Sequence, residues 1–295
     1  MSGAAAQVQA DLDRLLPILD ATLTRPFLEG EAARLGEAVR YSLKAGGKRV
    51  RPILCILAAE TVGGTADQAL PGALALEFIH TYSLIHDDLP AMDDDDLRRG
   101  RATNHKVFGE GHAILAGDAL LTEAFGVLAT AELEPARRAH ALALLAEAAG
   151  WRGMAGGQAL DLEGEGLEAY DLAHLMLIHR LKTGALLRAS LEIGAVLGGA
   201  EPAAQAALRA YGEAIGLAFQ IQDDILDATA TDADLGKRAG KDAGRGKITY
   251  PSLLGLDGAR EALSEATETA LCHLASLPNR DSLAAWARYL AQRAK

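Results

Sequence analysis

Two clusters of aspartate lie within otherwise apolar stretches, and their residue types suit the binding of a hard divalent cation. The segment SLIHDDLPAMDDDDLRRG carries Asp87, Asp88 and Asp93, and the segment FQIQDDILD carries Asp223 and Asp227. On a helix Asp223 and Asp227 are four residues apart, so their carboxylates share one face. Like charges in an apolar environment repel each other and are costly to bury. Magnesium removes that cost and prefers oxygen ligands, so the pattern predicts a magnesium site.

The first cluster needs an interruption of the helix to bring its carboxylates together. Asp87 and Asp93 are six residues apart, about 240° around an ideal helix. Pro90 lies between them, and its ring disrupts the preceding turn. We therefore predict that the helix ends or bulges near Asp88 and that Asp93 turns back toward Asp87. The alternative for the acidic run 93–96 is a solvated surface patch, but two separate clusters near cationic residues favour a paired site. An EF-hand is excluded because its glycine and glutamate positions are missing.

Cationic residues precede another apolar stretch and can bind an anion there. The segment GGKRVRP at 46–52 places Lys48, Arg49 and Arg51 at the start of a predicted helix. Free backbone N–H groups at a helix N-terminus, together with cationic side chains, favour anions. The segment is not a nucleotide P-loop, since the upstream glycine spacing is absent. Ordinary surface lysines and arginines are the alternative interpretation.

Further groups suited to an anion are spread along the chain: Arg98, Arg99, Lys182, Thr183, Lys237 and Lys247. Guanidinium groups make bidentate contacts with phosphate. Lys182 lies among apolar residues, where a lysine either extends to the surface or meets an anion. The glycine-rich stretch 235–247 can close over a charged ligand. His80 is by default a core histidine and Gln220 a helix-surface amide. Carboxylates with bound metal facing such cations suit the departure of a diphosphate.

Composition limits the class of protein. The chain has 295 residues, of which 49% are hydrophobic and only 4% aromatic, a balance that favours helices over sheets. The net charge of −11 argues against a nucleic-acid partner. Two cysteines without metal-ligand spacing fit a reducing compartment. No secretory signal or apolar run long enough to span a bilayer is visible, so we expect a soluble, cytoplasmic protein without a transmembrane segment.

Helical periodicity runs through nearly the whole chain, without a composition break. We therefore predict an all-α fold, with residues 1–295 forming one domain. Helices are expected at 50–62, 68–89, 111–131, 136–162, 168–198, 202–229, 259–276 and 281–294. Loops rich in glycine or charge are expected at 46–48, 94–109, 235–247 and 277–280.

The chain carries five motifs in order: GGKRVRP, DDLPAMD with DDLRRG, KTG, FQIQDDILD and GKITYP. These motifs resemble those of the trans-isoprenyl diphosphate synthase family, most closely its bacterial farnesyl diphosphate synthases. The match covers nearly the whole chain. The resemblance implies a large antiparallel helical bundle around a central cavity, assembled as a homodimer. It also implies condensation of isopentenyl diphosphate with an allylic diphosphate, by ionisation, condensation and proton elimination.

The resemblance also implies roles for single residues. Asp87, Asp93 and Asp223 would bind three magnesium ions, with Asp88 and Asp227 in support. The allylic diphosphate would be held by Arg98, Lys182, Thr183, Gln220, Lys237 and Lys247. Isopentenyl diphosphate would be held by Lys48, Arg51, His80 and Arg99. Among these, Arg98 and Lys182 are expected to act in catalysis with the aspartates.

Product length is expected to depend on the residues just before the first aspartate pair. In the family these residues close off the growing chain, and here they are Tyr82 and Ser83. A bulky Tyr82 predicts a fifteen-carbon product, unless it only packs in a core. One alternative is a synthase with a ten- or twenty-carbon product. Another is a terpene cyclase, which would not need isopentenyl diphosphate. A third is a non-catalytic partner subunit, but such subunits typically lack the aspartates that this chain keeps.

Overall fold

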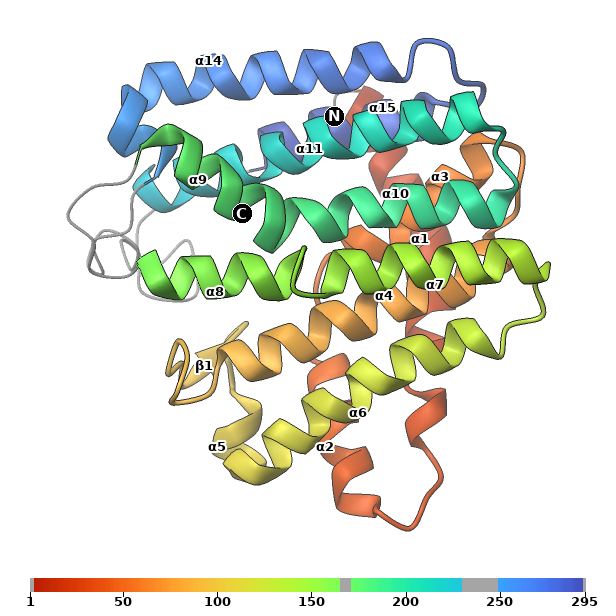
Figure 1. The fold of residues 1–295 in the computed structure, drawn as a ribbon, viewed down its shortest axis with the longest axis vertical. Helices are drawn as coiled ribbons and strands as arrows, with labels where there is room; N and C mark the ends of the chain where they lie inside the picture. Colours follow the sequence, from red (N-terminus) through yellow and green to blue (C-terminus); the bar gives the residue numbers. More distant parts are fainter. Residues whose placement is uncertain (1–2, 165–170, 230–248, 294–295) are drawn as a thin grey trace.

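The chain folds into a bundle of helices, which confirms the predicted all-α class (Figure 1). The computed structural model describes residues 3–164, 171–229 and 249–293. Its helices are α1 (Gly3–Thr22), α2 (Ala33–Leu43), α3 (Val50–Thr61), α4 (Ala66–Asp87), α5 (Asn104–Phe108), α6 (Glu110–Ala129), α7 (Pro135–Ala149), α8 (Met154–Gly164), α9 (Leu172–His179), α10 (Ala185–Gly198), α11 (Pro202–Thr229), α14 (Tyr250–His273) and α15 (Asp281–Gln292). A 3₁₀ turn spans Arg25–Phe27, and a π-helical segment spans Arg180–Gly184. Strands β1 (Leu97–Arg98) and β2 (Arg101–Ala102) form an antiparallel hairpin.

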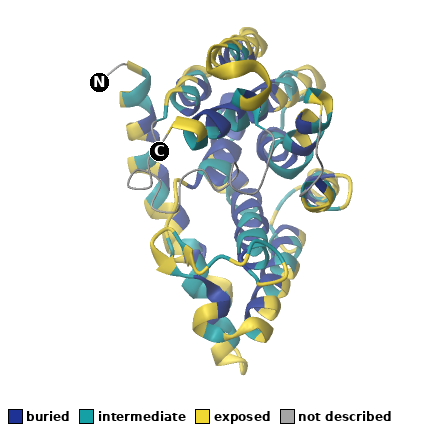
Figure 2. Ribbon diagram, turned by 90° about the vertical axis from the view of Figure 1, so that its left-hand side faces the viewer, coloured by how far each residue is buried: buried dark blue, intermediate teal, exposed yellow. Residues whose placement is uncertain are grey.

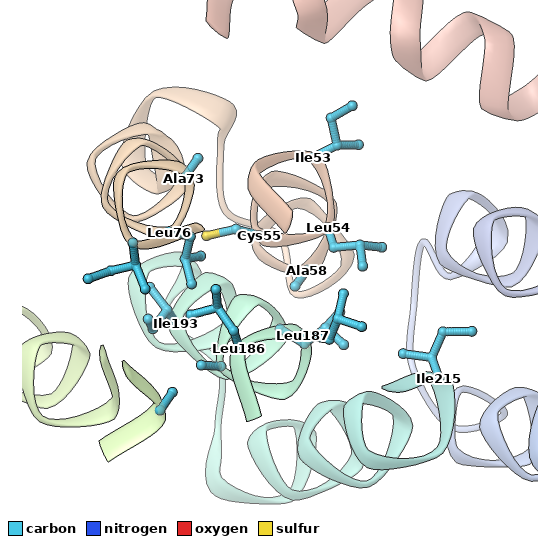
Figure 3. Close-up of a cluster of buried hydrophobic side chains, with 14 of the residues drawn as sticks. Ile53, Leu54, Cys55, Ala58, Ala73, Leu76, Leu186, Leu187, Ile193 and Ile215 are labelled. Atoms are coloured by element: carbon cyan, nitrogen blue, oxygen red, sulfur yellow. The ribbon is translucent and has the colours of Figure 1, made fainter. Parts of the chain in front are cut away.

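Helices α3, α4 and α10 form the centre of the bundle. Most of their residues are buried, and Figure 2 shows that buried residues gather in the interior of the bundle. Leu54 and Cys55 of α3, Leu76 of α4 and Leu187 of α10 are all fully buried, and they lie in the cluster drawn in Figure 3. Burying a leucine stabilises the fold by about 1.5–3 kcal/mol, so this cluster fixes the helices that carry the acidic and basic motifs.

The end of α4 has the predicted interruption. The helix starts with a capping box between Thr65 and Gln68 and ends at Asp87, with Asp88 at the C-cap. Beyond it the backbone N–H of Asp93 donates to the carbonyl of Asp87 at 2.8 Å. The chain therefore turns back after the helix, and the predicted return of Asp93 toward Asp87 is confirmed.

Two of the predicted element bounds were wrong. The predicted helix 136–162 is broken between α7 and α8, where Gly153 approaches the preceding turn. A Cβ there would lie 2.6 Å from the carbonyl oxygen of Glu147, so only glycine fits. The predicted loop 94–109 contains the β1–β2 hairpin and the short helix α5, which local composition did not reveal.

Two further predicted helices differ in detail. The run 168–198 contains α9 and α10, but the π-helical segment Arg180–Gly184 separates them. The last long helix, α14, begins at Tyr250 rather than at 259, and Gly255, with φ of 71°, produces a kink inside it. A π-helical segment follows from packing rather than from propensity, which explains why periodicity missed it.

The close crossing of α10 over α3 gives a stability prediction. A Cβ at Gly194 would lie 2.9 Å from both the carbonyl carbon of Cys55 and the Cβ of Ala58. We expect Gly194→Ala to lower the free energy of unfolding by about 1–3 kcal/mol, because the helix backbones must separate. Gly111→Ala is the control, since a Cβ there has open space, and it should be neutral or slightly stabilising. Urea denaturation measures both, and an unchanged stability of Gly194→Ala would contradict the packing described.

Candidate active site

The carboxylate of Asp87 lies in an environment that disfavours its charge. Burial, together with the nearby charge of Asp93, raises the pKa of Asp87 to about 6. Lys182, from the π-helical segment, and Arg98, from the hairpin, act in the opposite direction. A carboxylate pair held in partly desolvated surroundings fits a divalent cation, which would compensate both charges.

Asp88 has a different environment from its neighbour. Its side chain is buried, and one carboxylate oxygen, Oδ1, accepts a hydrogen bond from Nε of Arg98 at 2.7 Å and forms an ion pair with Nη2 at the same distance. Such a charge-assisted pair fixes the guanidinium in orientation. Asp88 therefore positions Arg98, and this contact links the end of α4 to the hairpin that follows it.

The second acidic motif lies on α11. Asp223 forms an ion pair with Arg293, whose guanidinium also lies 3.9 Å from the ring centroid of Phe219. The next residue, Asp224, is buried and accepts a hydrogen bond from the backbone N–H of Tyr250 at 2.9 Å. Asp224 thus joins α11 to the start of α14, whereas the side chain of Asp223 is 41% exposed and accessible to a ligand. Sequence reasoning did not identify Arg293, because a lone arginine near the chain end carries no motif signal.

The three cations of the segment at 46–52 divide into two groups. Arg49 is buried against Glu77, with Nη1 to Oε1 at 2.6 Å, and adopts a left-handed backbone with φ of 47°. It serves the fold. Arg51 is half-buried, and desolvation lowers its pKa to about 10, although Glu77 and Asp223 oppose that change. The Nε of Arg51 donates no hydrogen bond within the described part of the chain, so it is suited to an anionic ligand. Lys48 is exposed.

His80 and Arg99 lie close to Arg51. Burial lowers the pKa of His80 well below its ordinary value, and the charges of Arg51 and Arg99 add to this effect, so the imidazole is neutral. Arg99 donates to the carbonyl of Gly46, and its guanidinium lies over Gly47, where a Cβ would be 2.6 Å from Nη1. The hairpin and the segment before α3 therefore meet, which brings together the groups that the sequence proposed for one anion.

Lys182 has a partner that sequence reasoning missed. Its Nζ lies 2.6 Å from Oδ2 of Asp161 on α8, and both side chains are largely buried. Asp161 belongs to the segment GGQALDL at 156–162, whose acidic residue among apolar neighbours was the available signal. Thr183, next to Lys182, and Gln220 on α11 are both half-buried. Lys237 and Lys247 lie outside the described residues.

The residues expected to limit product length lie one turn before Asp87 on α4. The Tyr82 ring is half-buried and packs edge-to-face on His86, with ring centroids 5.7 Å apart. His86 Nε2 lies 3.0 Å from the carbonyl of Ile114 on α6. The hydroxyl of Ser83 donates to the carbonyl of His80 at 2.9 Å. Tyr82 is thus held against α6 through His86, whereas the hydroxyl of Ser83 has its hydrogen-bond partner within its own helix.

The described residues contain no preformed cluster of three or more metal-ligating side chains. This agrees with the coordination chemistry of magnesium, which is usually bound through one or two carboxylates together with phosphate oxygens of the substrate. The charge of Asp223 acts on Arg51, where it opposes the lowering of the pKa by burial. The charges of Arg51 and Arg98 both lower the pKa of His80, and Arg98 also acts on Asp87. Both acidic motifs therefore border one group of cations.

Known proteins resemble this chain over most of its length. The family model described as Polyprenyl synthetase matches residues 32–276. The farnesyl diphosphate synthase of Geobacillus stearothermophilus is 50% identical over 250 residues, which are 84% of each chain. Heterodimeric geranylgeranyl pyrophosphate synthase large subunit 1 of Arabidopsis thaliana is 54% identical over 237 residues, covering 78% of this chain and 64% of its own. An FPP/GFPP synthase of Zymomonas mobilis superposes with a TM-score of 0.88 at 38% identity, over 97% of this chain and 99% of that one.

The raised pKa of Asp87 predicts how metal-free stability depends on pH. In the unfolded chain this carboxyl has a pKa near 3.8, so between about pH 4 and 6 the folded state binds more protons. Stability therefore falls as the pH rises through this window. We expect Asp87→Asn, which is neutral throughout, to be more stable than the unmodified protein by about 1–2 kcal/mol at pH 7.5 after allowing for solvent screening. The difference should vanish below pH 4.

Urea denaturation in EDTA at pH 7.5 and pH 4 measures this difference. Asp257→Asn is the control, since the side chain of Asp257 is 95% exposed and its loss should leave stability nearly unchanged. An Asp87→Asn variant that is no more stable at pH 7.5 would show that the carboxylate is not electrostatically strained.

Proposed function

Because the chain belongs to the polyprenyl synthetase family of prenyltransferases, we propose that it condenses isopentenyl diphosphate with dimethylallyl and geranyl diphosphate to give farnesyl diphosphate. The observation that carries this proposal is the pair of acidic motifs on α4 and α11 bordering one cluster of cations. A diphosphate bound between them would meet cationic side chains directly and the carboxylates through metal ions.

Asp87, Asp93 and Asp223 would hold magnesium, whose ions stabilise the negative charge that develops on the departing diphosphate. The side chains fit this role because all three offer only oxygen ligands and because the pKa of Asp87 is raised in the absence of a cation. The family resemblance suggests three ions. Their remaining ligands would be phosphate oxygens and water.

The cationic residues would divide between two diphosphates. Arg98, oriented by Asp88, and Lys182, oriented by Asp161, are suited to the allylic diphosphate. The remaining candidates for that group are Thr183, Gln220, Lys237 and Lys247. Arg51 and Arg99, with Lys48 and the neutral His80, are suited to isopentenyl diphosphate. A neutral imidazole at position 80 can donate a hydrogen bond without adding to the positive charge already present.

The proposed reaction begins with cleavage of the allylic C–O bond at this site. The allylic C–O bond ionises as Arg98 and Lys182 stabilise the leaving diphosphate, and the double bond of isopentenyl diphosphate attacks the allylic cation. Loss of a proton from the new cation completes the condensation. The departed diphosphate is the base we propose for that proton, so no protein base is required. A second cycle with geranyl diphosphate gives the fifteen-carbon product.

Tyr82 supports the fifteen-carbon assignment within the family. Relatives of this chain include both farnesyl and geranylgeranyl synthases, so overall similarity does not distinguish the two lengths. The Tyr82 ring is braced on His86, which in turn contacts α6. A braced ring of this size one turn before the metal-binding aspartate would block a growing chain.

We also propose a homodimer that uses the exposed apolar face of α6. This helix is long and apolar enough by composition alone to cross a membrane, yet it packs against α4 and α7 within the bundle (Figure 1). Ile114 and Leu115 are exposed on it, at 45% and 53%. A second copy would cover this face. Residues 1–295 would form one domain, since α1 and α15, outside the matched range 32–276, pack on each other and on α3.

The central test uses two alanine variants. We expect Asp87→Ala and Asp223→Ala to fold normally and to lower kcat by about two orders of magnitude or more, because each loses ligands needed in the transition state. Radiolabelled isopentenyl diphosphate, geranyl diphosphate and magnesium give the rate, and circular dichroism checks the fold. Near-normal turnover in either variant would refute the proposed site, and product formed without isopentenyl diphosphate would indicate a cyclase instead.

A separate variant tests product length. Tyr82→Ala removes the braced ring, so we expect the main product to shift from fifteen to twenty carbons or more while condensation continues. Chromatography of the dephosphorylated products, at matched conversion, measures the shift. Ser83→Ala serves as the comparison, since Ser83 bonds only to its own helix in the contacts described and its loss removes little volume. An unchanged fifteen-carbon product in Tyr82→Ala would exclude Tyr82 as the floor.

A further inference from the structure

The π-helical segment Arg180–Gly184 is enclosed on two sides by glycines of neighbouring helices. On α8, a Cβ at Gly157 would lie 2.6 Å from the Cα of Lys182 and 2.8 Å from the carbonyl carbon of Leu181. On α11, a Cβ at Gly216 would lie 3.1 Å from the Cα of Gly184. The backbone of the segment therefore rests directly on both helices, with no side chain between them.

The contact on the α8 side fixes Lys182 at both ends. Gly157 touches the backbone of Lys182, and Asp161, one turn further along the same helix, binds its ammonium group at 2.6 Å. One face of α8 thus fixes the position of both the backbone and the ammonium group of Lys182. A π-helical turn has a displaced backbone that an ordinary helix would not supply, and such turns frequently occur at functional sites.

The other flank of the segment borders an open cavity. Its volume is about 640 Å³, and its lining includes Leu177, Arg180, Leu181 and Gly184, together with residues of α7, α10 and α11. Lys182 and Thr183 do not line it. Space is therefore available beside the segment, but a residue larger than glycine at 157 must shift the backbone of Lys182 rather than a flexible side chain.

We propose that Gly157 and Asp161 of α8 are positioning residues that hold Lys182 against the allylic diphosphate. This inference rests on the proposed function, in which Lys182 binds that diphosphate. A methyl group at 157 would meet the backbone nitrogen of Lys182 even more closely than its Cα, so it must displace the Lys182 backbone by at least about 1 Å to restore an ordinary contact distance of about 3.6 Å. A misplacement of that size at a reacting centre lowers activity by about a hundredfold.

The experiment is a double-mutant cycle with geranyl diphosphate as the varied substrate. We expect Gly157→Ala to lower kcat/KM by about tenfold to a hundredfold, and Lys182→Ala to lower it at least as much. The double variant should be no worse than Lys182→Ala alone, because both changes act through the same ammonium group. Gly157→Ala should lower the Tm by the same amount in the unmodified protein and in the Lys182→Ala variant. Gly111→Ala is the matched control and should leave kcat/KM unchanged.

Asp161→Asn gives a second approach that keeps the volume of the side chain. It should also lower kcat/KM for geranyl diphosphate and also be non-additive with Lys182→Ala, even if Gly157→Ala folds poorly. Multiplicative losses in both cycles, or full activity in both Gly157→Ala and Asp161→Asn, would overturn the inference while leaving the proposed function intact. Full activity of Lys182→Ala itself would instead remove the role of Lys182 in the proposed function.

Discussion

The charges of two acidic motifs must be compensated inside a helical bundle, and much of the architecture around the site serves that requirement. Asp87 lies where burial and nearby acidic charges raise its pKa to about 6, and Asp223 of α11 forms an ion pair with Arg293, which follows α15. Cations surround these carboxylates, but burial also lowers the pKa of Arg51 and His80. Without a ligand, the charged forms of Asp87 and of these two basic groups are therefore disfavoured. A magnesium-bound diphosphate would satisfy both at once, with metal ions meeting the carboxylates and phosphate oxygens meeting the cations.

Two of the proposed substrate-binding cations owe their orientation to an acidic residue. Asp88 holds Arg98, and Asp161 holds Lys182. Arg49 uses Glu77 in the same way, although that pair is buried within the fold. Pairs of this kind cost desolvation free energy, and their value here lies in fixing geometry before a substrate arrives.

The sequence predicted those features that depend on local chemistry. Pro90 indicated the end of α4 near Asp88, and apolar composition indicated the buried helix α3. It did not predict features that depend on neighbours distant in sequence. The π-helical segment follows from contacts with Gly157 and Gly216 on two other helices. Arg293 and Asp161 were missed because neither forms a recognisable cluster until the fold brings it beside Asp223 or Lys182.

The most direct test of the account is a calorimetric titration of magnesium into the full chain, with and without inorganic diphosphate. If both acidic motifs share one metal-bound diphosphate, magnesium should bind tightly only when diphosphate is present. That coupling should be lost on replacing either Asp87 or Asp223 with asparagine. Equal magnesium affinity with and without diphosphate, or coupling that survives in both variants, would contradict the account.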